Sequence, residues 1–221
     1  MTSSAPPPAD LGAALKRLPL FPLPQAVLFP GGLLPLHVFE PRYRALVRDA
    51  LATHRCLSVV LVANPAKVDA NGQPAICEVA GVGEIIEHVD LPGGRYNILL
   101  RGRARVRLME QPFVPPYRTA EATLLEDTGG PVDAVAQSAL LATANAFAAM
   151  VRDREQAIEM RVPTDASAGV SADLCAHYLL LDPRERQTVL ETFDVTTRVQ
   201  LVTDALSLQR LSFAQGSRSL N

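Results

Sequence analysis

The chain has 221 residues and a formal net charge of -2 at pH 7; 48% of its residues are hydrophobic and 20% are charged. This composition is that of a globular protein and excludes a disordered chain, and the length suffices for one large core or two coupled subdomains. The near-neutral charge excludes attraction of the whole chain to nucleic acid or to an anionic membrane surface.

The cysteines and the apolar segments bear on where the protein resides. Its three cysteines include no Cys-x-x-Cys pair, so we expect neither a disulfide framework nor a thiolate zinc site, and a reducing cytoplasm fits best. Residues 1–16 lack the basic start and apolar stretch of a secretion signal and are predicted to be a flexible leader. No segment is expected to reach the uninterrupted apolar length that a membrane-spanning helix needs.

The first half of the chain is predicted to be mainly β-structure that forms a small closed or partly closed barrel. Pro41 suits the first turn of one helix, and the apolar residues behind it recur at helical spacing. Residues 64–74 are predicted to be a polar loop, and Gly81 and Gly83 permit a bulge or a barrel corner. The expected strands cover residues 17–23, 34–39, 56–63, 76–91 (one bent strand or a pair), 96–110 and 118–125.

After residue 128 the apolar period changes from two to 3.6, which predicts helices. A long helix is expected over residues 132–151 and a short one over 172–181. Asp182 and Asp194 are predicted to be the N-caps of two further helices. The predicted fold is therefore α+β, with a flexible leader (1–16), a β-barrel (17–128), a helical bundle (129–212) and a flexible tail (213–221).

Three blocks of the sequence carry a family resemblance: LPLFPLPQAVLFPGGLLPLHVFEPRYRALV, GRYNILLRGRARVRL and LCAHYLLLDPRERQTVLETFDVTTRVQLVTDAL. In this order and at similar intervals they resemble the N-terminal substrate-binding domain of the ATP-dependent Lon protease, in its stand-alone bacterial form. The match spans residues 18–211. The resemblance implies a PUA-like β-barrel followed by a helical bundle, and a module that binds polypeptides.

The residues supply no recognisable catalytic set. A P-loop needs a glycine directly before its lysine, whereas the two lysines of the chain, Lys16 and Lys67, follow leucine and alanine. Neither lysine has the sequence context of the activated base in a serine–lysine peptidase. The four histidines are scattered without metal-ligand spacing. We therefore expect a non-enzymatic module without a cofactor or a metal, and keep an uncharacterised hydrolase as one alternative.

Four arginines at alternate positions form one candidate site. In an extended strand they project to the same face, where they can bind phosphate groups or an acidic peptide. Alternatively, their guanidinium groups pair with carboxylates of a neighbouring strand at position 84, 87 or 90. The first interpretation keeps an RNA-binding module as an alternative function, although little aromatic interleaving disfavours it. The four are Arg101, Arg103, Arg105 and Arg107.

The loop of residues 28–34 is the candidate site for apolar peptides. Its large apolar side chains Phe29 and Leu33 can be presented to an unfolded segment by a Pro-Gly turn at the barrel rim. Alternatively, Phe29 plugs the barrel. The other residues of this motif are predicted to have structural roles, with an arginine that bridges to a neighbouring glutamate or to the helical half: Pro30, Gly31, Glu40, Pro41, Arg42 and Tyr43.

The leading hypothesis is therefore a non-enzymatic module that holds unfolded or apolar polypeptide segments. It would hold them at the barrel rim or in the groove between the barrel and the helices. A protease is the expected partner, nucleic acid is less favoured, and a membrane is not expected. The sequence leaves the oligomeric state open.

Overall fold

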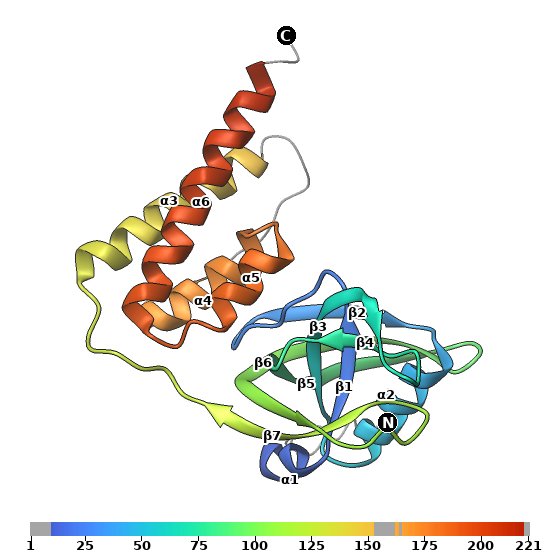
Figure 1. The fold of residues 1–221 in the computed structure, drawn as a ribbon. Helices are drawn as coiled ribbons and strands as arrows, with labels where there is room; N and C mark the ends of the chain where they lie inside the picture. Colours follow the sequence, from blue (N-terminus) through green and yellow to red (C-terminus); the bar gives the residue numbers. More distant parts are fainter. Residues whose placement is uncertain (1–9, 153–161, 164, 219–221) are drawn as a thin grey trace, which may run out of the picture.

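The computed structural model describes residues 10–152, 162–163 and 165–218. The predicted α+β fold is confirmed, because a β-barrel forms the first half of the chain and helices that project from it form the second (Figure 1). The elements of the barrel half are α1 (Leu11–Lys16), β1 (Leu18–Leu23), β2 (Leu33–Val38), α2 (Pro41–Ala52), β3 (Cys56–Val68), β4 (Pro74–Ile76), β5 (Val79–Leu91), β6 (Arg95–Glu110) and β7 (Thr119–Leu125).

The barrel closes through strands that are far apart in the sequence. Strand β1 pairs antiparallel with β7 and parallel with β3, so the order β1-β7-β6-β5-β3 returns to β1. The long strand β6 has two partners on one edge, β2 along residues 96–101 and β7 along residues 105–110. Between them, the Gly31 N–H donates to the Gly102 carbonyl at 2.9 Å, and the Gly102 N–H donates to the Gly32 carbonyl at 2.8 Å. The loop before β2 therefore fills the break between β2 and β7.

The first described residues form a helix rather than the predicted leader. Residues 11–16 are α1, which begins at Asp10 because the carboxylate of Asp10 accepts a hydrogen bond from the Ala13 N–H at 2.9 Å. Ala14 of this helix is fully buried against the barrel. The structure of residues 11–16 depends on packing against the barrel. The sequence of residues 1–16 alone does not reveal this packing.

Residues 64–74 also differ from the predicted polar loop. Strand β3 continues to Val68 and pairs with β4, with Val68 opposite Pro74 and Asn64 opposite Ala75. The side chains of this β3–β4 hairpin are mostly exposed. Because both faces meet water, the strand carries no alternation of apolar and polar residues that a sequence pattern could detect.

Helix α2 and strand β1 share one buried seam. Pro41 is the first residue of α2, and Tyr43 of its first turn stacks on Phe21 of β1 with ring centroids 4.2 Å apart. The Nε of Arg42 donates to the Glu40 carboxylate at 3.0 Å, and its guanidinium lies over the Tyr43 ring. These contacts hold the start of α2 against the barrel.

The second half consists of α3 (Ala134–Arg152), α4 (Ala168–Leu179), α5 (Pro183–Leu190) and α6 (Val195–Arg218). The two predicted N-caps are present, since Asp182 accepts a hydrogen bond from the Arg184 N–H at 2.6 Å and Asp194 accepts one from the Thr197 N–H at 2.8 Å. Local cap chemistry is therefore sufficient to place the starts of α5 and α6.

The bounds of two helices differ from the prediction. Helix α4 begins at Ala168 rather than Ala172, because the Ser167 hydroxyl accepts a hydrogen bond from the Val170 N–H at 3.3 Å and supplies an earlier cap. Helix α6 continues to Arg218, so residues 213–218 of the predicted flexible tail are helical. The aromatic ring of Phe213 packs edge to face against Phe147 of α3, with centroids 5.8 Å apart, which extends the helix.

The expectation that no segment is long and apolar enough to span a membrane is wrong for α3. Residues 134–151 pass that test by length and composition, and only 22% of them are buried. The buried residues, which include Leu140, Ala144 and Phe147, lie on one face that packs against α4 and α6. Length and composition alone therefore do not assign α3 to a membrane, and the cytoplasmic location stays a prediction.

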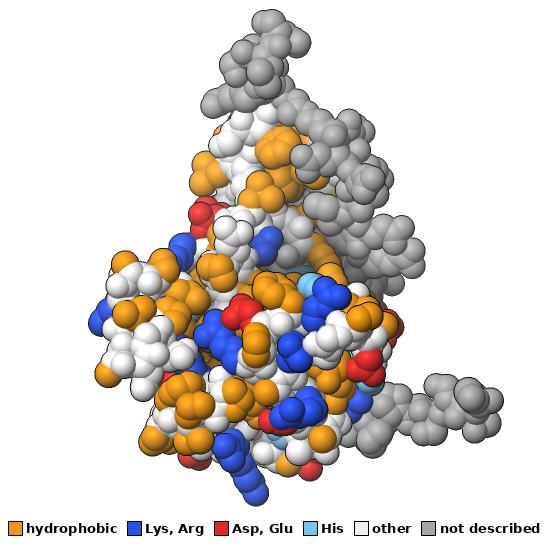
Figure 2. Space-filling view, turned by 90° about the vertical axis from the view of Figure 1, so that its right-hand side faces the viewer, with side chains coloured by type: hydrophobic (Ala, Val, Ile, Leu, Met, Phe, Trp, Pro, Cys, Tyr) orange, Lys and Arg blue, Asp and Glu red, His pale blue; other side chains and the backbone are white. Residues whose placement is uncertain are grey.

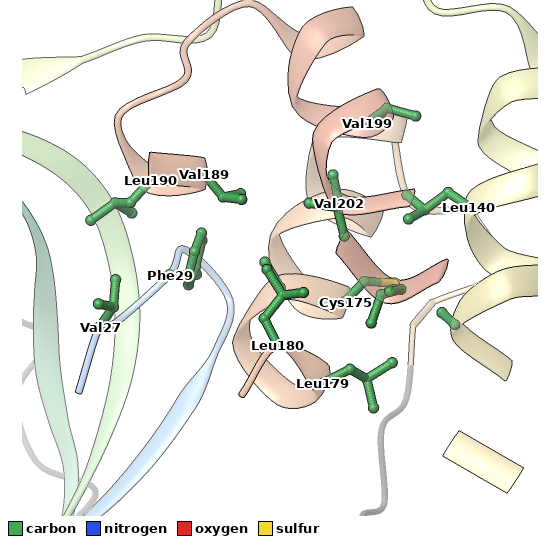
Figure 3. Close-up of a cluster of buried hydrophobic side chains, with 14 of the residues drawn as sticks. Val27, Phe29, Leu140, Cys175, Leu179, Leu180, Val189, Leu190, Val199 and Val202 are labelled. Atoms are coloured by element: carbon green, nitrogen blue, oxygen red, sulfur yellow. The ribbon is translucent and has the colours of Figure 1, made fainter. Parts of the chain in front are cut away.

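One hydrophobic core runs from the barrel into the bundle. The cluster in Figure 3 combines Val27 and Phe29, from the loop before β2, with side chains of α3, α4, α5 and α6. A separate cluster lies beneath α2, and a third combines Ala14 of α1 with side chains of β1, β3, β5, β6 and β7. The predicted division near residue 128 separates the elements, but the two halves share a core.

Candidate functional site

The loop of residues 27–32, directly before β2, lies at the junction between the barrel and the helices. Phe29 is fully buried there, and Figure 3 shows its ring between the barrel strands and the helical side chains. A Cβ at Gly81 would lie 1.8 Å from the Leu28 carbonyl oxygen, and one at Gly102 would lie 1.9 Å from that of Phe29. Only glycine at these two positions lets the loop backbone lie directly against the strands. The interpretation of Phe29 as an exposed peptide-binding side chain is therefore wrong.

Leu33 follows this loop as the first residue of β2 and is 39% exposed. Its backbone is fixed by α4, because the Tyr178 hydroxyl accepts a hydrogen bond from the Leu33 N–H at 3.1 Å and the Leu33 carbonyl lies 3.0 Å from Nε2 of His177. The His177 ring leaves no space for a side chain at Gly32, whose Cβ would lie 2.7 Å from it. The loop is thus held on both sides, by strands and by α4.

Lowering the pH is expected to destabilise the fold partly through His177. Burial lowers the pKa of this ring; its contact with the Leu33 carbonyl opposes the shift, and the charge of Arg186 adds to it. As the pH falls, the ring in the unfolded chain binds a proton near pH 6.5, whereas the ring in the folded protein does so only at a lower pH. The stability contributed by the neutral ring is therefore complete above about pH 6.5 and is lost progressively as the pH falls from there towards the folded-state pKa.

Urea unfolding of the wild type and of His177→Gln at about pH 7.5 and about pH 5 measures this dependence. We expect the wild type to lose more stability than the variant between the two pH values. An equal loss in both proteins would show that His177 does not contribute to the pH dependence.

The arginines of β6 do not form one basic row. Arg105 is buried and projects into the helical half, where its Nη1 donates to the Asp173 carboxylate at 2.9 Å and its Nε donates to the Leu190 carbonyl at 3.1 Å. Arg103 lies at a bulge in the β5–β6 pairing and donates to Glu84 of β5 at 2.6 Å. Arg107 is exposed and lies 3.6 Å from the carboxylate of Glu78. The interpretation of Arg105 as a surface ligand is therefore wrong.

Arg105 belongs to a largely buried network of two arginines and two aspartates at the junction, in which Asp127 is partly exposed (43% of its side chain). Arg198 of α6 is fully buried, and its Nη2 donates to Asp127 at 2.6 Å. Its Nε lies 3.1 Å from Asp173, although without the direction of a hydrogen bond. Gly169 provides the space for this pairing, since a Cβ there would lie 2.8 Å from both Arg198 and Asp127. The network joins β6, the segment after β7, α4 and α6.

The electrostatics of the two aspartates differ. Burial raises the pKa of Asp173, against the opposing hydrogen bond and charge of Arg105. Burial also acts to raise the pKa of Asp127, but the hydrogen bond and charge of Arg198 outweigh it and hold that pKa below its ordinary value. Each carboxylate contacts a guanidinium, so the network links β6 and the segment after β7 to α4 and α6.

The cysteine thiols in the described part of the chain have raised pKa values; for Cys77, which packs against the shared core, burial is the main cause. Burial raises the pKa of Cys175 to about 12, and burial together with the charge of Glu84 raises that of Cys56 to about 11. Both side chains therefore stay protonated and act as small apolar core residues. Among the residues that the structure describes, no three His, Cys, Asp or Glu side chains are grouped so that they could hold a metal ion.

A shallow apolar groove lies between the last turns of α3 and the second half of α6. We call it the outer groove; its volume is about 350 Å³, and it is lined by Met150, Ser207, Arg210, Leu211 and Ala214. Leu208 and Leu211 of α6 are 64% and 61% exposed. Large apolar side chains that stay exposed beside a groove are typical of a surface that binds another molecule.

The family described as "ATP-dependent protease La (LON) substrate-binding domain" matches residues 17–207. The chain belongs to this family. The Lon substrate-binding domain therefore covers both the barrel and most of the bundle. The similarity is thus to the domain of Lon that the family description calls substrate-binding.

Full-length Lon proteases are among the relatives. Lon protease 2 of Myxococcus xanthus is 28% identical over 87% of this chain and 24% of the relative. The Lon protease of Roseiflexus castenholzii is 30% identical over the same shares. The chain thus spans about a quarter of the length of these relatives.

Solved Lon N-terminal domains have the same fold. The N-terminal domain of the Lon protease from the Mycobacterium avium complex has a TM-score of 0.62 and 19% identity, and the match covers 87% of this chain and 98% of that one. The Lon N-terminal domain protein from Xanthomonas campestris has a TM-score of 0.59 and 24% identity, with 83% and 95% covered. Both matches cover most of each chain and show that this chain shares the fold of those domains.

Sequence reasoning missed the buried network and the outer groove of this Lon substrate-binding domain. One signal pointed to the network: Arg198 lies within the apolar stripe of its helix, between Val195 and Val202, and a charged residue there needs a buried partner. No comparable signal pointed to the outer groove, because the exposed leucines of α6 become a surface only beside α3.

Proposed function

We propose that the outer groove holds apolar side chains of unfolded polypeptide segments. The observation that carries this proposal is the exposure of Leu208 and Leu211 beside a groove whose lining includes one charged side chain, Arg210. The predicted loop site is filled by Phe29, so it offers no such surface. The family binds protein substrates, and the outer groove supplies the exposed apolar area that such binding requires.

The chemistry of the outer groove fits an apolar segment. A groove of about 350 Å³ accommodates one or two large aliphatic or aromatic side chains. Met150 contributes an unbranched, adaptable side chain, which suits ligands of varied shape. The relatives are named Lon proteases, so the segments held here are destined for a protease partner.

The distribution of exposed side chains disfavours the nucleic-acid alternative. Figure 2 shows hydrophobic side chains exposed both on the projecting helices and on the barrel, with basic and acidic side chains mixed among them on the barrel. Arg105 is buried and Arg103 is paired with Glu84, so the basic row on which RNA binding would depend is interrupted.

Introducing two aspartates at the outer groove is expected to weaken polypeptide binding. Each of Leu208 and Leu211 would contribute about 1.5–3 kcal/mol if fully covered, so Leu208→Asp with Leu211→Asp should raise the Kd by roughly tenfold or more. Fluorescence anisotropy with fluorescein-labelled, unfolded casein measures the Kd.

The matched control places the same two charges on the barrel. Val89 and Met109 are exposed there, and Val89→Asp with Met109→Asp should leave the Kd nearly unchanged. An equal loss in both double variants would assign binding to net charge rather than to the outer groove. Absence of saturable casein binding by the wild type would refute the proposed function itself.

A further inference from the structure

A second hollow, of about 380 Å³, lies where α1, the end of α2 and the start of β7 meet. It is on the side of the barrel away from the projecting helices (Figure 1), so it is independent of the outer groove. Its volume falls in the range of small-molecule pockets. Helix α2, strand β7 and three connecting segments contribute polar side chains to its wall: Arg17, Asp49, Thr53, His54, Tyr117 and Thr119.

The one carboxylate in this wall is already engaged. One oxygen of Asp49 lies 3.0 Å from the Arg48 guanidinium, and the other accepts a hydrogen bond from the Tyr117 hydroxyl at 2.9 Å. The Thr53 hydroxyl donates to the Asp49 carbonyl at 2.8 Å. Burial and the hydrogen bond to Asp49 raise the pKa of Tyr117 to about 12, so this hydroxyl stays neutral. These bonds hold the side chains of Asp49, Thr53 and Tyr117 in place without a ligand.

Two donors of the wall have no acceptor among the residues that the structure describes. Arg17 is exposed and makes no ion pair or side-chain hydrogen bond within the described part of the chain. The Cys56 N–H donates to Nδ1 of His54 at 3.1 Å, so the proton of the neutral ring is on Nε2, where it is free to donate. Asp10, whose charge reaches His54, is occupied as the cap of α1. A cation and an N–H group therefore remain for a ligand.

We propose that this hollow binds a small molecule that carries a carboxylate or a phosphate group, with Arg17 and His54 as the donors to its oxygens. Arginine suits both groups because its guanidinium can make two parallel hydrogen bonds to either. The engaged Asp49 does not repel such an anion as a free carboxylate would, since Arg48 balances its charge.

A nuclear magnetic resonance titration of the full chain tests this site with two probes, inorganic phosphate and N-acetylglycine, at constant ionic strength set with chloride. We expect saturable shifts of the backbone amides of Thr53, His54 and Thr119 with at least one probe. Losing the charge-assisted bond in Arg17→Gln should weaken binding by roughly tenfold or more. The probe that binds tells whether the ligand group is a phosphate or a carboxylate.

Arg107→Gln is the matched control, because it removes the same charge from an exposed arginine of β6. Its affinity for the probe should stay within roughly twofold of the wild type, since exposed charges far from the site are screened. The site is overturned if neither anion gives saturable shifts, or if the Arg17→Gln and Arg107→Gln variants respond alike. Neither result bears on casein binding at the outer groove.

Discussion

Replacing Arg198 by methionine is expected to lower the free energy of unfolding by about 1.5–3 kcal/mol, because it removes the charge-assisted hydrogen bond to Asp127 and one of the two guanidinium groups beside the buried Asp173. Arg198 is fully buried and contacts Asp127 and Asp173. It also donates to the Thr192 carbonyl at 2.9 Å. Methionine fills part of the same space but supplies no charge and no donor. Urea unfolding followed by circular dichroism at neutral pH measures the change.

Arg103→Met is the control for this experiment. Arg103 also forms one short ion pair, with Glu84 at 2.6 Å, but 45% of its side chain is exposed. Pairs of this kind contribute about 0–1 kcal/mol, so the control should stay close to the wild type. If the two variants lost similar stability, the buried network would not be what joins the barrel to the bundle.

Replacing Phe29 by alanine is expected to cost about 3–5 kcal/mol of unfolding free energy, the range for a large buried aromatic side chain. Phe29 is fully buried in the cluster shared by both halves. Its ring lies 6.3 Å from that of His177, and the Arg105 guanidinium lies 6.0 Å above it. Truncation would therefore leave a cavity in the shared cluster beside the buried network, and it would loosen the packing of the cluster and of the network. Thermal or urea unfolding gives the magnitude.

Phe39→Ala provides the comparison, because Phe39 is 60% exposed and should change the stability by at most about 0.5 kcal/mol. Casein binding by Phe29→Ala, measured at a temperature where the variant is folded, separates the two roles considered for this residue. If Phe29 only fills the core, the Kd of Phe29→Ala for casein stays that of the wild type once the variant is folded. A large rise in the Kd with little loss of stability would restore Phe29 as a binding residue.

The sequence by itself determined most of the elements and many of their limits, but not α1 or the β3–β4 hairpin. Pro41 starts α2, Asp182 and Asp194 cap α5 and α6, and the change of apolar period separates the strands from the helices. Each of these depends on residues a few positions apart, whose hydrogen bonds and spacing follow directly from the order of the chain. Three blocks spread over both halves were sufficient to indicate the family.

Only the tertiary structure decided which side chains face solvent. Alternation along β6 places Arg105 on the outside of the barrel, but it does not reveal that α4 covers that part of the wall with Asp173, 68 positions away. Phe29 is likewise buried by helices that follow it by more than a hundred residues. A periodic pattern specifies the face of an element, whereas burial depends on what packs against that face. For this reason the candidate binding surface is the outer groove and not the loop of residues 28–34.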